Sequence, residues 1–285
     1  MRYLDAHNHL QDERFEGRQE VLIAECRAAG VVRMVVNGAC AEDWPAVVGL
    51  ARRHPDLIQP SLGWHPWYLH ERGPDWEREF EEWLDRESDA AVGEIGLDRW
   101  ILEQPAAIRA RYAPGLAGIE PTALEEQERA FRLQWRAAVE RGRAVTVHCL
   151  RAWGRLVEVL RSEKLPQRGF LLHSYGGPVE LVPVLAGLGA YFGFPGYFLH
   201  AGKERQRMAF RQVPLDRLLV ETDAPDQIPP NGFIRHPLKE TGVGRGVNHP
   251  ANLGTIQAGL AAVLGVGEEE LAERMEDNFG RLFGR

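Results

Sequence analysis

The sequence predicts a single domain over residues 1–285 that folds as a (β/α)8 TIM barrel with a C-terminal helical extension. Three observations lead to this prediction. Eight short apolar runs recur along the chain, amphipathic helical patterns separate them, and no GxGxxG follows the first run, which argues against an open dinucleotide-binding sheet. Runs such as VVRMVV and RLLVET are almost continuously apolar, as expected for parallel strands that are buried on both faces.

Predicted strands and helices alternate along the chain. The apolar runs lie near residues 3–6, 31–36, 57–62, 90–95, 144–147, 169–172, 190–194 and 218–220. Helical periodicity is found near residues 18–29, 42–53, 76–87, 123–141, 152–163, 178–187 and 203–212, with two further helices at 251–264 and 268–280. Eight such pairs in a chain of this length are typical of a barrel. An open doubly wound sheet is the alternative.

One connection is much longer than the others. Residues 99–122 lie between the fourth and fifth apolar runs and leave from the carboxyl end of a strand, the end of a barrel that carries the active site. We therefore predict a long loop that forms a lid or a substrate wall, the alternative being a solvent-exposed ornament. It brings Arg109 and Arg111 near the rim, where they could bind phosphate or belong to a solvated surface.

Charge and composition restrict the classes of function. A net charge of −7 excludes a global basic field for long duplex DNA, so any contact with phosphate has to be local. Three cysteines without a CxxC pair, and no secretory signal at the start, suit a cytoplasmic protein. Residues 181–199 are uncharged, but their two prolines and four glycines favour buried elements over a membrane span. Nothing in the sequence identifies an obligate protein partner.

Side chains that bind metals gather at the ends of the predicted strands. Alternate residues of a strand point the same way, so the two histidines of DAHNHL project together. The carboxyl ends of all strands of a parallel barrel meet at one rim. This brings together His7, His9, Glu94, His148, His173 and Asp223. Burying four imidazoles and two carboxylates without a cation would leave several polar groups unsatisfied.

The number of ligands indicates two divalent ions. Two groups are separated in barrel order, with one carboxylate between them. They are His7, His9 and Asp223 for one ion, His148 and His173 for the other, and Glu94 as the bridge. Imidazole-rich ligation favours Zn or Mn over Mg without excluding Mg. A hydroxide that bridges two such ions could attack an ester bond.

Ordered motifs along nearly the whole chain resemble one known family. These motifs are DAHNHL, GWHP, GEIGLD, TVHC, HSYGG, ETDAP, NHPANL and DNFGRLF. They resemble the TatD-like metal-dependent hydrolases, within the amidohydrolase-like barrel group. The resemblance implies a binuclear site of the same six residues, with Glu94 in the place that a carboxylated lysine takes elsewhere in the group. None of the three lysines lies at the end of a predicted strand, so no candidate for such a carbamate exists.

The resemblance also implies an activity. Family members are similar to Mg- or Mn-dependent deoxyribonucleases that act from the 3′ end, so we expect phosphodiester hydrolysis of DNA at single strands or 3′ ends. Asp223 would accept a proton from the attacking water, Glu94 would be the second catalytic carboxylate, and His65 would contact substrate oxygens. Many relatives carry a phosphate-binding arginine two positions after the fifth-strand histidine; here Leu150 occupies that position and Arg151 follows it.

Other interpretations are compatible with such a site. A metal hydroxide also attacks carbonyl carbon, so the alternative activity is hydrolysis of a carboxylic ester, amide, lactone or small phosphoester. A metal-bound but non-catalytic nucleic-acid-binding protein is a third hypothesis, which the acidic composition opposes. Trp64 and Trp67, on either side of His65, could stack a nucleobase or close the barrel end.

Overall fold

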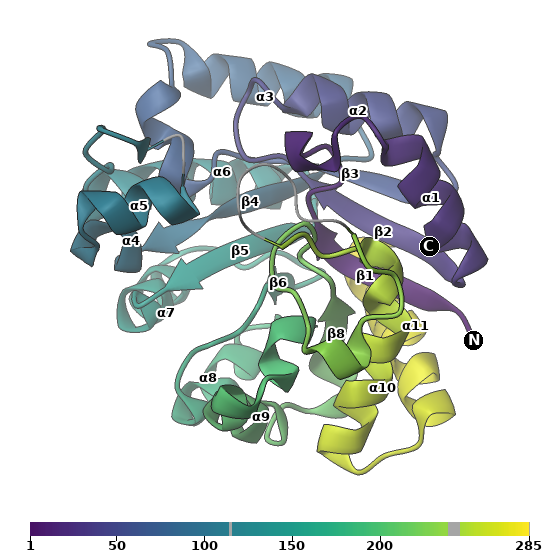
Figure 1. Ribbon diagram of the computed structural model, residues 1–285. Helices are drawn as coiled ribbons and strands as arrows, with labels where there is room; N and C mark the ends of the chain where they lie inside the picture. The colour runs from purple at the N-terminus through teal and green to yellow at the C-terminus, as the bar shows by residue number, and fades with distance from the viewer. Residues whose placement is uncertain (114–115, 239–245, 285) are drawn as a thin grey trace.

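The computed structural model describes residues 1–113, 116–238 and 246–284, and these residues include eight parallel strands in one sheet. The strands are β1 (Tyr3–Asn8), β2 (Val31–Asn37), β3 (Ile58–Leu62), β4 (Ala91–Asp98), β5 (Val145–Leu150), β6 (Phe170–Leu172), β7 (Ala190–Pro195) and β8 (Leu218–Glu221). Strands that follow one another in the chain are neighbours in the sheet. The predicted barrel is therefore confirmed (Figure 1).

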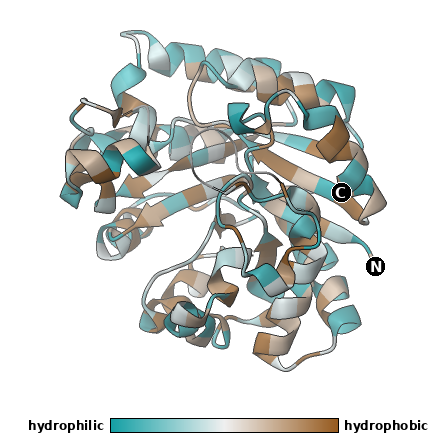
Figure 2. Ribbon diagram, in the orientation of Figure 1, coloured by the Kyte–Doolittle hydropathy of each residue, from teal (hydrophilic) through white to brown (hydrophobic). Residues whose placement is uncertain are grey.

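Helices surround the strands on the outside of the barrel (Figure 1). They are α1 (Gln19–Ala28), α2 (Trp44–Arg53), α3 (Trp76–Arg86), α4 (Trp100–Glu103), α5 (Ala106–Tyr112), α6 (Leu124–Glu140), α7 (Trp153–Ser162), α8 (Val182–Gly187), α9 (Glu204–Phe210), α10 (Leu253–Leu264) and α11 (Glu268–Phe283). Hydropathy follows these layers, because the strands are mainly apolar and the helices carry polar residues as well (Figure 2). Among the described helices, none combines the length and apolar character needed to cross a bilayer.

Helix α11 covers the amino end of the barrel. Phe279, Leu282 and Phe283 form one apolar cluster with residues near the amino ends of the strands, including Leu4 and Leu219. The side chain of Asn278, on the same helix, donates hydrogen bonds to the carbonyl oxygens of Leu215 (2.8 Å) and Leu218 (2.7 Å). The predicted C-terminal extension thus fills the end of the barrel opposite the predicted metal ligands, where it removes apolar surface from water.

The first and last strands meet at the carboxyl end of the barrel. The backbone N–H of Asp223 donates to the carbonyl of His7 (2.9 Å), and the N–H of His9 donates to the carbonyl of Ala224 (2.7 Å). Below them, the buried Asp5 carboxylate accepts hydrogen bonds from the backbone (2.9 Å) and hydroxyl (2.5 Å) of Thr222. These contacts hold the residues predicted to bind one metal ion on two adjoining strand ends.

The long connection after β4 contains regular structure, which corrects the prediction of a loop. Helices α4 and α5 lie within residues 99–122, and Ile101, Ala113 and Leu116 form a small buried cluster. The indole of Trp67, which follows β3, packs against this cluster. Burial of these apolar side chains explains why the segment folds instead of extending into solvent.

Candidate metal centre

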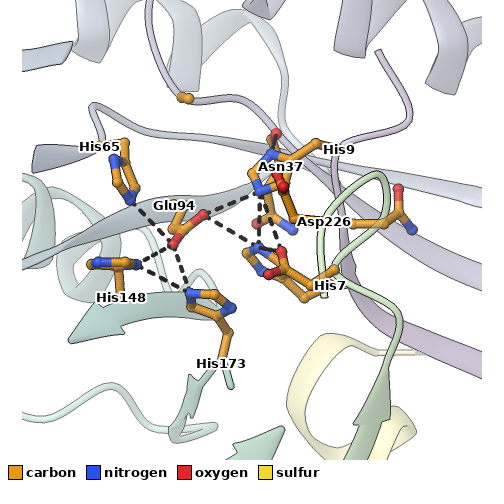
Figure 3. Close-up of polar contacts among 12 residues, drawn as sticks. His7, His9, Asn37, His65, Glu94, His148, His173 and Asp226 are labelled. Carbon is orange, nitrogen blue, oxygen red and sulfur yellow. Dashed lines mark hydrogen bonds and ion pairs between the residues drawn. The ribbon is translucent and has the colours of Figure 1, made fainter. Parts of the chain in front are cut away.

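The six predicted ligands lie together at the carboxyl end of the barrel, and Figure 3 labels all of them except Asp223. His7 is in β1 and Glu94 in β4, His148 is in β5, His9 and His173 directly follow β1 and β6, and Asp223 lies two residues beyond β8. Five of the six are buried, and the His9 side chain is 18% exposed. The alternation of side chains along each strand brings them to one place, as the sequence predicted.

Glu94 occupies the centre of the group. Its Oε2 atom lies 3.2 Å from Nε2 of His7 and 3.3 Å from Nε2 of His9. Its Oε1 atom lies 2.8 Å from Nδ1 of His148 and 2.8 Å from Nε2 of His173. The two carboxylate oxygens therefore face two different pairs of histidines (Figure 3).

Two further side chains complete the two halves of the centre. Asp223 Oδ1 lies 3.5 Å from His7 Nε2 and 3.6 Å from His9 Nε2. Its backbone has a left-handed φ of 50°, an uncommon conformation outside glycine that is found at functional sites. His65 Nε2 lies 3.4 Å from Glu94 Oε1, on the side of His148. The predicted substrate residue His65 is thus close enough to be another donor of that half.

Hydrogen bonds on the outer side of the rings fix which nitrogens face inward. His9 Nδ1 lies 2.8 Å from the carbonyl oxygen of Asn37, which can only accept, so Nδ1 carries a hydrogen and Nε2 is the nitrogen that faces the cluster. His148 Nε2 lies 3.1 Å from Asp98 Oδ2, whereas His173 Nδ1 lies 3.7 Å from Glu221 Oε1, beyond hydrogen-bond distance. Outer oxygen partners of this kind are usual for histidines that bind metals.

The donor set fits divalent cations. Within each of three groups, His7–His9–Asp223, His7–Glu94–His173 and His65–Glu94–His148, the ligand atoms lie within 4.8 Å of one another. Imidazole nitrogens and carboxylate oxygens together suit Zn, Mn or Mg. Cations among these groups would satisfy converging lone pairs that are otherwise buried next to one another.

Burial and mutual charge set the protonation of the centre. Burial raises the pKa of the Asp223 carboxyl to about 7, against the opposing effects of His173 and His9. Burial alone would raise the pKa of Glu94, but the charges of the surrounding histidines hold that pKa well below its usual value. Burial lowers the pKa of His65 to about 4. Glu94 is therefore the fixed negative charge, and Asp223 is the carboxylate able to exchange a proton near neutral pH.

Arg151, a predicted phosphate contact, lies beside the mouth. It directly follows β5 in a left-handed conformation (φ 54°), and its guanidinium donates to Glu103 of α4 at 2.9 Å. Arg151 and Arg99 line a cavity of about 340 Å³ next to the N-terminus of α7. Arg151 therefore lies at the edge of the site, where its ion pair with Glu103 joins it to the segment after β4.

The other two predicted arginines lie within the segment after β4. Arg109 is buried, and its guanidinium donates to the carbonyl of Gln104 (3.2 Å) and the carboxylate of Glu120 (3.1 Å). Its charge is therefore used inside the segment. Arg111 is on the exposed face of α5. The structure does not bring either of them among the histidines, because α5 packs on its own small cluster.

Sequence reasoning missed Asp98 and the residues that hold it. Strand β4 extends to Asp98, three residues beyond the predicted run, so Glu94 and Asp98 point to the same side. Gly96 between them permits a close approach of β5, since a Cβ there would lie 1.9 Å from the His148 carbonyl oxygen. The alternation of Glu94, Gly96 and Asp98 in GEIGLD was the sequence signal that could have predicted a strand extending to Asp98. Gln127 of α6, 29 residues further along the chain, is hydrogen-bonded to the Asp98 backbone. A local sequence pattern does not reveal a contact over this separation.

Comparison with known proteins agrees with this geometry. The family model described as TatD related DNase matches residues 4–284. The chain belongs to this TatD-related family. The metal-dependent hydrolase YjjV of Escherichia coli K12, itself described as uncharacterized, is 28% identical over 99% of this chain and 98% of its own length. A TatD protein of Edwardsiella piscicida, named a 3′-5′ ssDNA/RNA exonuclease, is 30% identical over 79% of this chain and 80% of its own.

The TatD fold is shared as well. The crystal structure of the YjjV TatD homologue of Escherichia coli K12 superposes with a TM-score of 0.82 and 24% identity, over 99% of this chain and 98% of that one. Membership of the TatD family makes the protein a metal-dependent hydrolase and confirms the family predicted from the motifs.

Proposed function

We propose that this protein is a divalent-metal-dependent nuclease that shortens single-stranded nucleic acid from its 3′ end by hydrolysing phosphodiester bonds. The observation that carries the proposal is the position of Glu94, whose two oxygens face two separate pairs of histidines. This arrangement suits two ions side by side, a common device for phosphodiester cleavage. Membership of the TatD family, which includes proteins named ssDNA/RNA exonucleases, supports the same substrate class.

The proposed ligands form two groups, one on the side of each carboxylate oxygen of Glu94. His7, His9 and Asp223 would hold one ion and His148 and His173 the other, with Glu94 shared between them. Bound divalent ions supply positive charge for the phosphoryl oxygens and make a water molecule more acidic. Zn, Mn and Mg are the candidates.

The residues of the chain itself supply proton transfer and positioning. Asp223 would accept the proton from the attacking water; without a bound ion, burial raises the pKa of its carboxyl to about 7. His65, beside Glu94 in the half that holds His148, contacts an oxygen of the substrate. Arg151 at the edge of the mouth is a candidate contact for a more distant phosphate.

Burial of the centre favours the end of a strand as the substrate. The side chains of Glu94 and His148 are 3% and 8% exposed, and His9 is the most open of the ligands at 18%. A rigid duplex cannot insert a backbone phosphate into so closed a centre, whereas a single-stranded end can enter. The net charge of −7 also opposes broad binding to duplex DNA.

The test is metal-dependent shortening of nucleic acid. Single-stranded DNA and RNA with a 5′ label are incubated with chelator-stripped protein to which Mg, Mn or Zn is restored. We expect progressive loss of nucleotides from the 3′ end, abolished by Glu94→Ala. A matched control is Glu276→Ala on α11, paired with Arg2 at the other end of the barrel. Intact nucleic acid with every metal, beside hydrolysis of an aryl ester, would refute the proposal.

A further inference from the structure

Asp98 connects a predicted metal ligand to the segment that carries His65. Asp98 is fully buried at the end of β4. Its Oδ1 accepts a hydrogen bond from the backbone N–H of Ile101 at 2.9 Å. Its Oδ2 accepts one from the indole N–H of Trp67 at 2.6 Å, and the same oxygen lies 3.1 Å from His148 Nε2.

These contacts determine the tautomer of His148. Two N–H donors already point at the Asp98 carboxylate, and its oxygens accept from both. His148 Nε2 must then carry the hydrogen that it shares with Asp98. A histidine that binds a metal ion is neutral and has one hydrogen, so with that hydrogen on Nε2 the Nδ1 atom of His148 would present its lone pair to an ion on the side of Glu94 and His173.

The backbone of Asp98 is held as firmly as its side chain. Gln127 Oε1 accepts from the N–H of Asp98 at 2.7 Å, and Gln127 Nε2 donates to the carbonyl of Asp98 at 3.1 Å. Gln127 is fully buried on α6. The carboxylate therefore has little freedom to follow His148 if that ring turns.

Trp67 connects the same carboxylate to the rest of the mouth. It lies in the 3-10 helix Pro66–Glu71 that begins directly after His65, and its ring meets the His65 ring edge to face at 5.1 Å. Its other neighbours are the apolar side chains of Ile101, Ala113 and Leu116, from the segment after β4. The indole N–H is used by Asp98, and part of the ring is covered by that segment.

We propose that Asp98 is a positioning residue of the metal centre, which fixes the ring and tautomer of His148, and that Trp67 holds the Asp98 carboxylate in place. The affinity for the ion bound by His148 and His173 then depends on both residues. The segment of residues 99–122 acts through this contact, because its small cluster supports Trp67. This inference rests on the metal centre assigned under the proposed function.

Two substitutions separate the roles of the carboxylate and the indole. Asp98→Asn keeps the size of the side chain, but its amide can donate to His148 Nε2 and so move the ring hydrogen to Nδ1, where it blocks metal binding. Trp67→Phe keeps an aromatic ring against the segment but removes the N–H donor and the part of the indole that carries it. Trp44→Phe is the matched control, because the buried Trp44 indole also donates near the end of β3, to the Gly63 carbonyl at 3.2 Å.

The measurement is the affinity for Mn and for Zn in competition with a chelating dye, without nucleic acid. We expect Asp98→Asn to weaken one of two ions by roughly 10- to 100-fold, the usual effect of an outer partner of a metal-bound histidine. Trp67→Phe should weaken the same ion by about fivefold, equivalent to one net hydrogen bond. Trp44→Phe should change neither affinity.

A spectroscopic readout distinguishes positioning from general damage. In the Zn-loaded protein, the ¹⁵N shifts of His148 should report hydrogen on Nε2 and a metal-bound Nδ1 for the wild type, and Asp98→Asn should lose this pattern, with both proteins folded by circular dichroism. Wild-type affinity in Asp98→Asn would overturn the inference. Wild-type metal affinity in Trp67→Phe, with a raised KM for nucleic acid, would overturn the role of Trp67 and make it a substrate platform.

The outcome is separable from that of the proposed function. Metal affinity is measured without substrate, so a wild type that binds two ions but leaves nucleic acid intact would refute only the nuclease activity. A wild type that binds neither Mn nor Zn would refute the metal centre and this inference together.

Discussion

Replacement of Gln127 by leucine tests how strongly helix α6 holds the end of strand β4. The fully buried Gln127 side chain makes three hydrogen bonds, with the N–H of Asp98 (2.7 Å), the carbonyl of Asp98 (3.1 Å) and the carbonyl of Thr122 (2.9 Å). Leucine has nearly the same volume but cannot form any of them. The substitution therefore removes polar contacts without opening a large cavity.

The expected loss of stability follows from these bonds. Each contributes about 1 kcal/mol net, and a buried backbone group left without a partner costs about 1–3 kcal/mol. The N–H of Asp98 is such a group. We expect Gln127→Leu to lower the free energy of unfolding by about 3 kcal/mol, a large fraction of the 5–15 kcal/mol typical of a folded domain.

Urea unfolding followed by tryptophan fluorescence measures this difference. Gln134→Leu is a parallel case, because Gln134 clamps the backbone of Trp64 with bonds of 2.7 and 3.3 Å, and a similar loss is expected. Gln212→Leu at an exposed position should stay within about 0.5 kcal/mol of the wild type. A Gln127→Leu protein as stable as the Gln212→Leu control would refute the idea that glutamines of α6 hold the strand ends.

Further predictions concern the metal centre, the barrel end and the segment after β4. A hundredfold excess of Mn over its Kd should raise the free energy of unfolding by about 2.7 kcal/mol; Glu94→Gln should lose most of this gain, and a full gain would argue against the bridging role. Phe279→Ala should destabilise the metal-free protein by about 3–5 kcal/mol in urea, whereas a loss below about 1 kcal/mol would contradict its core position. Arg109→Met should leave the KM for single-stranded DNA unchanged, because that guanidinium is used within its own segment; a raised KM would indicate a substrate contact.

Much of the barrel and the cluster of ligands could be predicted because both depend on local patterns. Apolar runs mark the strands, and a histidine or carboxylate at the end of a run is carried to the common rim by the closure of the sheet. Asp98 escaped prediction because Gly96 and Asp98 interrupt the apolar pattern although the strand continues through them. Contact with His148 across 50 residues depends on strand pairing, which a single sequence does not record.

The burial of the two glutamines of helix α6 was not predicted, for a different reason. Gln127 and Gln134 lie in a strongly charged amphipathic helix, where glutamine usually faces water, yet both are buried against the backbone of strand ends. The two short helices after β4 were missed because helices of this length have little intrinsic stability. They depend on packing against Trp67, and such tertiary support is invisible in local propensity.

Closure between the first and last strands has a consequence for unfinished or broken copies of this protein. Asp5 and Thr222, 217 positions apart, are hydrogen-bonded directly below the site, and His7 and Asp223 are joined by a backbone hydrogen bond. A ribosome-bound chain that has not yet emerged through β8, or a proteolytic fragment without it, lacks one wall of the centre and one of its carboxylates. Hydrolytic activity is therefore expected only once the ring is complete, because the half of the centre that contains Asp223 forms only when the last strand has joined the first.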